Sequence, residues 1–98
     1  MAFDQRPLIF SFRAIEHGST ERVESTIVIG LPEVLGARND YTCPININGF
    51  HNLSTRVIGA TPFQALDLAI ALVKIEMNAH ADQWAFFFGE DGPVSFAS

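Results

Sequence analysis

Apolar and polar residues alternate along the first half of the chain with a period of two. From Pro7 to Glu16 the apolar side chains that share one side of an extended backbone are Leu8, Phe10, Phe12 and Ala14. The same alternation runs from about Glu21 to Ile29, from Tyr41 to Asn48, and from Leu53 to Gly59. A period of two is typical of strands that bury one face. The pattern therefore predicts four β-strands.

Turn-forming residues separate these strands. His17–Thr20 and Gly49–Asn52 are short and contain glycine, so each predicts a hairpin turn. The stretch from Gly30 to Asp40 contains Gly30, Pro32 and Gly36 and predicts a loop of roughly ten residues. Pro44 cannot donate a ladder hydrogen bond, so its strand should lie at a sheet edge or carry a bulge there.

The pattern then changes to that of a helix. Thr61 is the expected N-cap, Pro62 takes the first helical position, and Gln64 completes a capping box. From Phe63 to about Ala79 the polar residues form a narrow stripe and the rest are apolar. A helix this apolar should be buried over a wide arc.

A last strand follows the helix. The run from Trp84 to Phe88 is apolar on both faces, which predicts a central or doubly covered strand. Gly89–Pro93 is the expected turn after it. Residues 94–96 would then add a short final strand or pack as a tail.

The order of these elements, β-β-β-β-α-β, predicts a single α+β domain spanning residues 1–98. We expect a two-layer sandwich, in which one long helix covers one face of a mainly antiparallel sheet of four to six strands. The sheet face beneath the helix should bear six apolar residues: Phe10, Phe12, Ile27, Ile29, Ile45 and Ile47. The opposite face should be polar but sparsely charged.

Composition narrows the classes of function. Apolar residues make up 48% and charged residues 17% of the chain, so few charges cover a small domain and self-association is expected. The net charge is −5 and no basic run occurs, which argues against a nucleic-acid partner. No apolar stretch predicts a signal peptide or a membrane span, and the single cysteine fits a reducing compartment, so a cytoplasmic location is expected.

No residue pattern points to catalysis, a metal or a cofactor. The chain lacks GxSxG, HExxH, CxxC and phosphate-loop motifs. Cys43 lies on the apolar side of its strand and is expected to pack in the core. His17, His51 and His80 are not spaced as metal ligands usually are, and surface positions are their expected role. The minority alternative is a metal site assembled by folding from Glu16, His17, His51 or a distant acid.

Two sets of residues are candidate binding surfaces. On the polar sheet face, Arg13, Glu24, Asn46 and Arg56 could bind an anionic ligand, although an ordinary solvated face is the favoured explanation for them. In the long loop, the apolar Leu31, Val34 and Leu35 either hold the loop against the domain or meet a partner.

These features favour a non-enzymatic protein-interaction domain that self-associates. A narrower version is an acidic immunity-type protein that masks a basic partner, which the net charge of −5 permits. The alternative is a small-molecule binding protein or enzyme that uses the polar sheet face for an anionic ligand.

One stretch of the chain also resembles a known group of proteins. TCPININGF, then VIGATPFQALDLAIALVKIE, then a strand containing Trp84 together resemble a family of short bacterial proteins that is defined only as a domain of unknown function. The resemblance covers about Tyr41 to Phe88. It implies a bacterial origin and a similar α+β fold, and it implies no activity and no catalytic residues.

Overall fold

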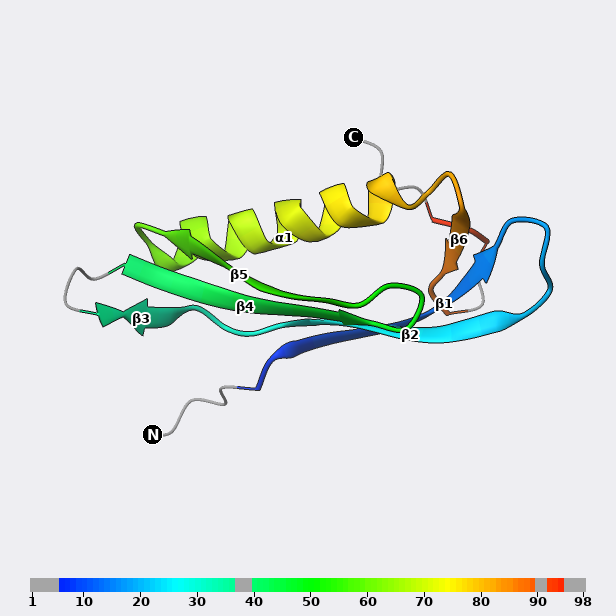
Figure 1. Cartoon of the computed structure of the whole chain (residues 1–98). Helices are drawn as coiled ribbons and strands as arrows, with labels where there is room; N and C mark the ends of the chain where they lie inside the picture. Colours follow the sequence, from blue (N-terminus) through cyan, green and yellow to red (C-terminus); the bar gives the residue numbers. More distant parts are fainter. Residues whose placement is uncertain (1–5, 37–39, 90–91, 95–98) are drawn as a thin grey trace.

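The computed structural model describes residues 6–36, 40–89 and 92–94. In chain order its elements are β1 (Leu8–Glu16), β2 (Arg22–Ile29), β3 (Glu33–Leu35), β4 (Asp40–Asn48), β5 (Leu53–Gly59), α1 (Pro62–Ala79) and β6 (Trp84–Phe87). The six strands form one antiparallel sheet and α1 lies across one of its faces (Figure 1). The predicted α+β two-layer architecture is confirmed.

Neighbouring strands of the sheet are antiparallel, and α1 connects the two edges of the sheet. One edge of β4 pairs with β5, and its other edge pairs with β2 over Ile45–Asn48 and with β3 over Asp40–Thr42. Next come β1, which pairs with β2, and β6, which pairs with β1. The sheet is thus five strands wide, and α1 carries the chain from β5 at one edge to β6 at the other.

The predicted loop from Gly30 to Asp40 is wrong in part, because it contains β3. Ile29 stands opposite Ile45 and Glu33 opposite Thr42, so three residues (30–32) face two (43 and 44). This extra residue is a bulge, and it lies beside Pro44, whose carbonyl oxygen accepts a hydrogen bond from the Gly30 N–H at 2.8 Å. Of the two predictions for Pro44, the edge is wrong, and the bulge lies opposite Pro44, in the segment between β2 and β3, rather than in β4 itself.

Of the two predictions for Trp84–Phe88, the central strand is wrong, since β6 lies at an edge of the sheet, whereas both faces of the strand are at least partly covered. Among the described residues β6 pairs with β1 alone, over Arg13–Glu16. Its outer side receives one hydrogen bond, from the Val94 N–H to the Phe86 carbonyl oxygen at 2.9 Å. Phe86 is buried in the core, whereas Phe87 lies beneath the Arg13 guanidinium on the other face. Consecutive residues of β6 are therefore apolar for two different reasons: Phe86 packs in the core, and Phe87 contacts Arg13 on the opposite face.

The start of α1 has the predicted N-cap, but the return bond of the capping box goes to the residue before the cap. Thr61 Oγ1 accepts a hydrogen bond from the Gln64 N–H at 3.0 Å, and Gln64 Oε1 accepts one from the Ala60 N–H at 2.6 Å. The helix buries Ala65, Ala69, Val73 and Met77. In the part of the chain that the structure describes, no helix is long and apolar enough to cross a membrane.

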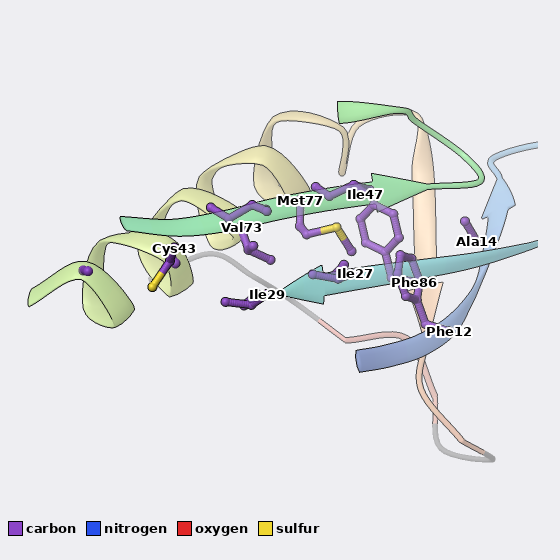
Figure 2. Close-up of a cluster of buried hydrophobic side chains, with 12 residues drawn as sticks. Phe12, Ala14, Ile27, Ile29, Cys43, Ile47, Val73, Met77 and Phe86 are labelled. Atoms are coloured by element: carbon purple, nitrogen blue, oxygen red, sulfur yellow. The ribbon is translucent and has the colours of Figure 1, made fainter. Parts of the chain in front are cut away.

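The core has an aliphatic part and an aromatic part. Beneath α1, which packs on β4 and β5, lie Ile27, Ile29, Cys43, Ile45 and Ile47. Toward β6, the Phe12 ring contacts the rings of Phe50, Phe86 and Phe88 at centroid distances of 5.8, 5.9 and 5.0 Å. Figure 2 shows Phe12 and Phe86 together at one end of the core and Cys43 near the helix at the other. Of the six residues predicted beneath the helix, Phe10 is the exception, with 44% of its surface exposed.

Gly59 sets how closely α1 approaches the sheet, and its replacement is the first testable change. A Cβ atom there would lie 2.5 Å from the Ala65 amide nitrogen, which belongs to the helix backbone and cannot rotate away. We expect Gly59→Ala to lower the free energy of unfolding by about 1–3 kcal/mol in a urea titration. Gly92→Ala is the control, because no atom lies within 4 Å of the added methyl group. Equal stabilities of the two variants would contradict this packing.

Candidate functional site

The helix leaves one corner of the apolar sheet face uncovered. Because α1 packs on β4 and β5, the beginning of β1 and the end of β2 face an open groove of about 240 Å³. We call it the β1 groove. Its lining consists of Leu8, Phe10, Ile27, Ile29, Ile70, Val73, Lys74 and Phe88.

The β1 groove is apolar and open to water. Leu8, Phe10 and Ile70 each keep about two fifths of their surface exposed. Lys74 is the one residue of the lining with a charged group. Small-molecule sites usually place several polar groups around an apolar pocket to orient the ligand, and this lining does not. The groove is therefore better suited to apolar side chains than to a substrate.

Beside the groove, β1 has a free edge. β6 pairs with β1 only over Arg13–Glu16, so within the described residues no strand pairs with the outer edge of Leu8–Phe12. The sequence from Pro7 to Phe12 contains no charged residue, and Ile9 is 61% exposed on the opposite face. Edge strands are commonly protected by charges, proline or a covering segment. Among the residues that the structure describes, the protection of this edge is limited to Pro7, at its beginning.

The predicted polar-face residues do not form one cluster. Arg13 stands opposite Glu24, but its guanidinium donates a hydrogen bond to the Gly89 carbonyl oxygen and lies 6.0 Å from the centre of the Phe87 ring. Arg56 is on β5, so β2 and β4 separate it from Arg13 by about 14 Å across the sheet. Its partner Pro44 lies beside Gly30, six residues along β2 from Glu24, which adds about 20 Å along the strands. Asn46 stands opposite Val28, four residues along β2 from Glu24.

The predicted interaction loop is held to the sheet by β3. Val34 is opposite Tyr41 and is 59% exposed, whereas Leu31 and Leu35 are half-buried. One exposed valine is a smaller apolar surface than the β1 groove and its edge. Among the described residues, open apolar surface is thus found at the start of β1 and also on α1, where Phe63 and Ile75 are 80% and 63% exposed.

Cys43 lies in the core, as predicted. Its side chain is fully buried beneath α1, and burial raises the pKa of the thiol, with a further contribution from the negative charge of Glu33. A raised pKa keeps the sulfur protonated, and the thiolate is the form that acts as a nucleophile. The geometry therefore gives Cys43 a packing role.

Folding brings together a second group of side chains, of which the sequence predicted only His51 and an unspecified distant acid, as a minority alternative. The side chains of His51, Glu76 and His80 place one potential ligand atom each within 4.8 Å of the others. All three are partly exposed. One signal was present in the sequence, because Glu76 and His80 are four residues apart and so share a helix face. His51 comes from the β4–β5 turn, and nothing in the sequence pattern joins that turn to the end of the helix.

Comparison with known proteins does not identify the chain. It matches no protein-family model, no curated protein and no solved structure. The resemblance of residues 41–88 to short bacterial proteins therefore stays a prediction. The features of the structure that bear on function are the β1 groove, the edge of β1 beside it, and the cluster of His51, Glu76 and His80.

The rate at which the Cys43 thiol is labelled tests whether this thiol is buried and protonated in the native protein. We expect a disulfide reagent at pH 8 to label native protein at least about tenfold more slowly than protein unfolded in guanidinium. Above the ordinary pKa of 9.0, the unfolded thiol loses its proton before the native one, so this residue makes the free energy of unfolding fall as pH rises. Rapid labelling of the native protein would contradict the buried, protonated thiol.

Proposed function

We propose that this protein is a non-enzymatic interaction domain that self-associates through the outer edge of β1. The observation that carries the proposal is the unpaired edge of Leu8–Phe12 directly beside the open β1 groove. An unpaired edge offers backbone N–H and C=O groups to another strand, and a neighbouring apolar surface gives that strand side-chain contacts. The occupant we propose is the same segment of a second copy.

Two copies of this edge can pair symmetrically. Identical antiparallel strands are related by a two-fold axis, so Leu8–Phe12 of each copy would face the same segment of the other. Leu8 and Phe10 of each copy would then pack beside those of the other copy on one continuous apolar face. The molecule is elongated, measuring 50 × 28 × 21 Å, which leaves a long side available for such an interface.

The distribution of charge supports a second copy as the partner. At a net charge of −5 two copies repel each other, so a self-interface should contain few carboxylates. Neither the segment from Pro7 to Phe12 nor the lining of the β1 groove contains an acidic residue. A basic partner would instead be expected to meet a surface rich in Asp and Glu.

The test compares one substitution in the proposed interface with one outside it. Wild-type protein is expected to be a dimer by light scattering coupled to size-exclusion chromatography. Phe10→Glu places a charge in each half of the interface, and we expect its dimer dissociation constant to rise at least about 100-fold. Ile58→Glu is the control, because Ile58 is similarly exposed (52%) but lies on β5, at the other side of the sheet.

Three outcomes would contradict the proposal. The first is a wild-type protein that stays monomeric at high concentration. The second is a Phe10→Glu variant that dimerises as tightly as wild type while its circular dichroism shows a native fold. The third is dissociation by Ile58→Glu alone, which would place the interface at β5.

A further inference from the structure

The end of α1 and the β4–β5 turn present three side chains that commonly bind metal ions. Glu76 is in the last turn of the helix, His80 is the C-cap residue, and His51 lies in the turn opposite them. The rings of His51 and His80 are 4.3 Å apart, centre to centre, and His51 Nε2 is 3.7 Å from Glu76 Oε2. Two imidazoles and one carboxylate form the His₂Glu ligand set found in zinc sites.

The spacing of the ligand atoms suits a bound ion. With metal–ligand bonds of about 2.0–2.1 Å, the ligand atoms of a tetrahedral Zn²⁺ lie about 3.3 Å apart. The 3.7 Å between His51 and Glu76 is longer than a hydrogen bond and close to that value. All three ligand atoms lie within 4.8 Å of one another, so small side-chain rotations would complete the geometry.

The backbone on the helix side of the cluster is held by several hydrogen bonds. The His80 N–H donates to the carbonyl oxygen of Met77 at 3.2 Å, and the His80 carbonyl oxygen accepts from the N–H groups of Gln83 and Trp84 at 3.1 and 3.0 Å. The His80 ring also meets the edge of the Phe50 ring at a centroid distance of 5.6 Å. The position of this ligand is therefore set before any ion binds.

The turn that carries His51 is anchored on β2. Ser25 is buried, and its Oγ accepts a hydrogen bond from the Phe50 N–H at 3.0 Å while donating to the Val23 carbonyl oxygen at 3.2 Å. Gly49 precedes this bond with a φ of 118°, and a Cβ there would collide with Ser25. The turn is thus fixed one residue before His51.

We propose that His51, Glu76 and His80 bind one divalent transition-metal ion, with Zn²⁺ as the best match to two imidazoles and a carboxylate. The three protein ligands leave one tetrahedral position to water, because the cluster is partly exposed. A bound ion would join the end of α1 to the β4–β5 turn, which are 25 or more residues apart in sequence. The site lies apart from the β1 groove, and none of its three residues lines that groove.

The experiment is a zinc titration of metal-free protein by isothermal calorimetry. We expect one Zn²⁺ per chain in the wild type. Glu76→Gln and His51→Gln, which remove one ligand each with little change in size, should each weaken binding at least about 100-fold. His17→Ala is the control, because His17 is the one histidine of the chain outside the cluster. Its ring is hydrogen-bonded to the Ala81 carbonyl oxygen, and zinc affinity should be unchanged in this variant.

Trp84, the single tryptophan of the chain, gives a second readout. Its ring lies 5.7 Å from that of Phe50, next to His51, so paramagnetic Ni²⁺ in the site should quench its fluorescence. Zinc should also raise the melting temperature of the wild type, and Glu76→Gln should abolish that rise. The proposal is overturned if no saturable binding occurs up to about 1 mM Zn²⁺. It is equally overturned if both ligand variants, folded by circular dichroism, bind as the wild type does, or if His17→Ala weakens binding as much as they do.

Discussion

The apolar face of the sheet is wider than the single helix that packs against it. A helix of 18 residues is about 27 Å long and about 10 Å across, which covers two strands spaced 4.8 Å apart. The sheet is five strands wide, and α1 takes β4 and β5. The start of β1 and the side of the sheet toward β6 lie beyond the helix, and both proposed sites depend on how these parts are covered.

The parts of the sheet face that α1 leaves uncovered differ in which side chains pack against them. Near the end of α1, rings from β1, β6 and the β4–β5 turn fill the space, and Phe12, Phe50 and Phe86 replace a second helix. The same packing brings the turn against the helix end, which is why His51 meets Glu76 and His80. At the beginning of β1 nothing among the described residues fills the face, and Leu8 and Phe10 remain open to water. Both proposals therefore arise from one packing problem.

Local sequence patterns predicted the strands and the helix. The order of the strands and the contacts between distant segments could not be predicted from them. The alternation at Tyr41–Asn48 and the Thr61–Gln64 cap predicted β4 and the start of α1, because both depend on residues close in sequence. Pro44 predicted a bulge, but not that the extra residue would lie in the facing segment after Ile29, since that depends on which strand lies beside Pro44. The edge position of Trp84–Phe87 was mistaken for a central one for the same reason: the Phe87 ring is covered by Arg13, a contact between distant segments. His51 was named as a possible ligand, but Glu76 and His80 were not predicted as its partners because only folding brings its turn to the helix.

Hydrogen–deuterium exchange over a series of protein dilutions tests the central claim most directly. The claim is that the uncovered corner of the sheet is buried by a second copy, so the outward-facing amides of residues 8–12 should exchange slowly in concentrated protein and faster on dilution. Amides of β4, which is paired on both edges, should exchange at the same rate throughout. Exchange at residues 8–12 that is equally fast at every concentration would contradict the account.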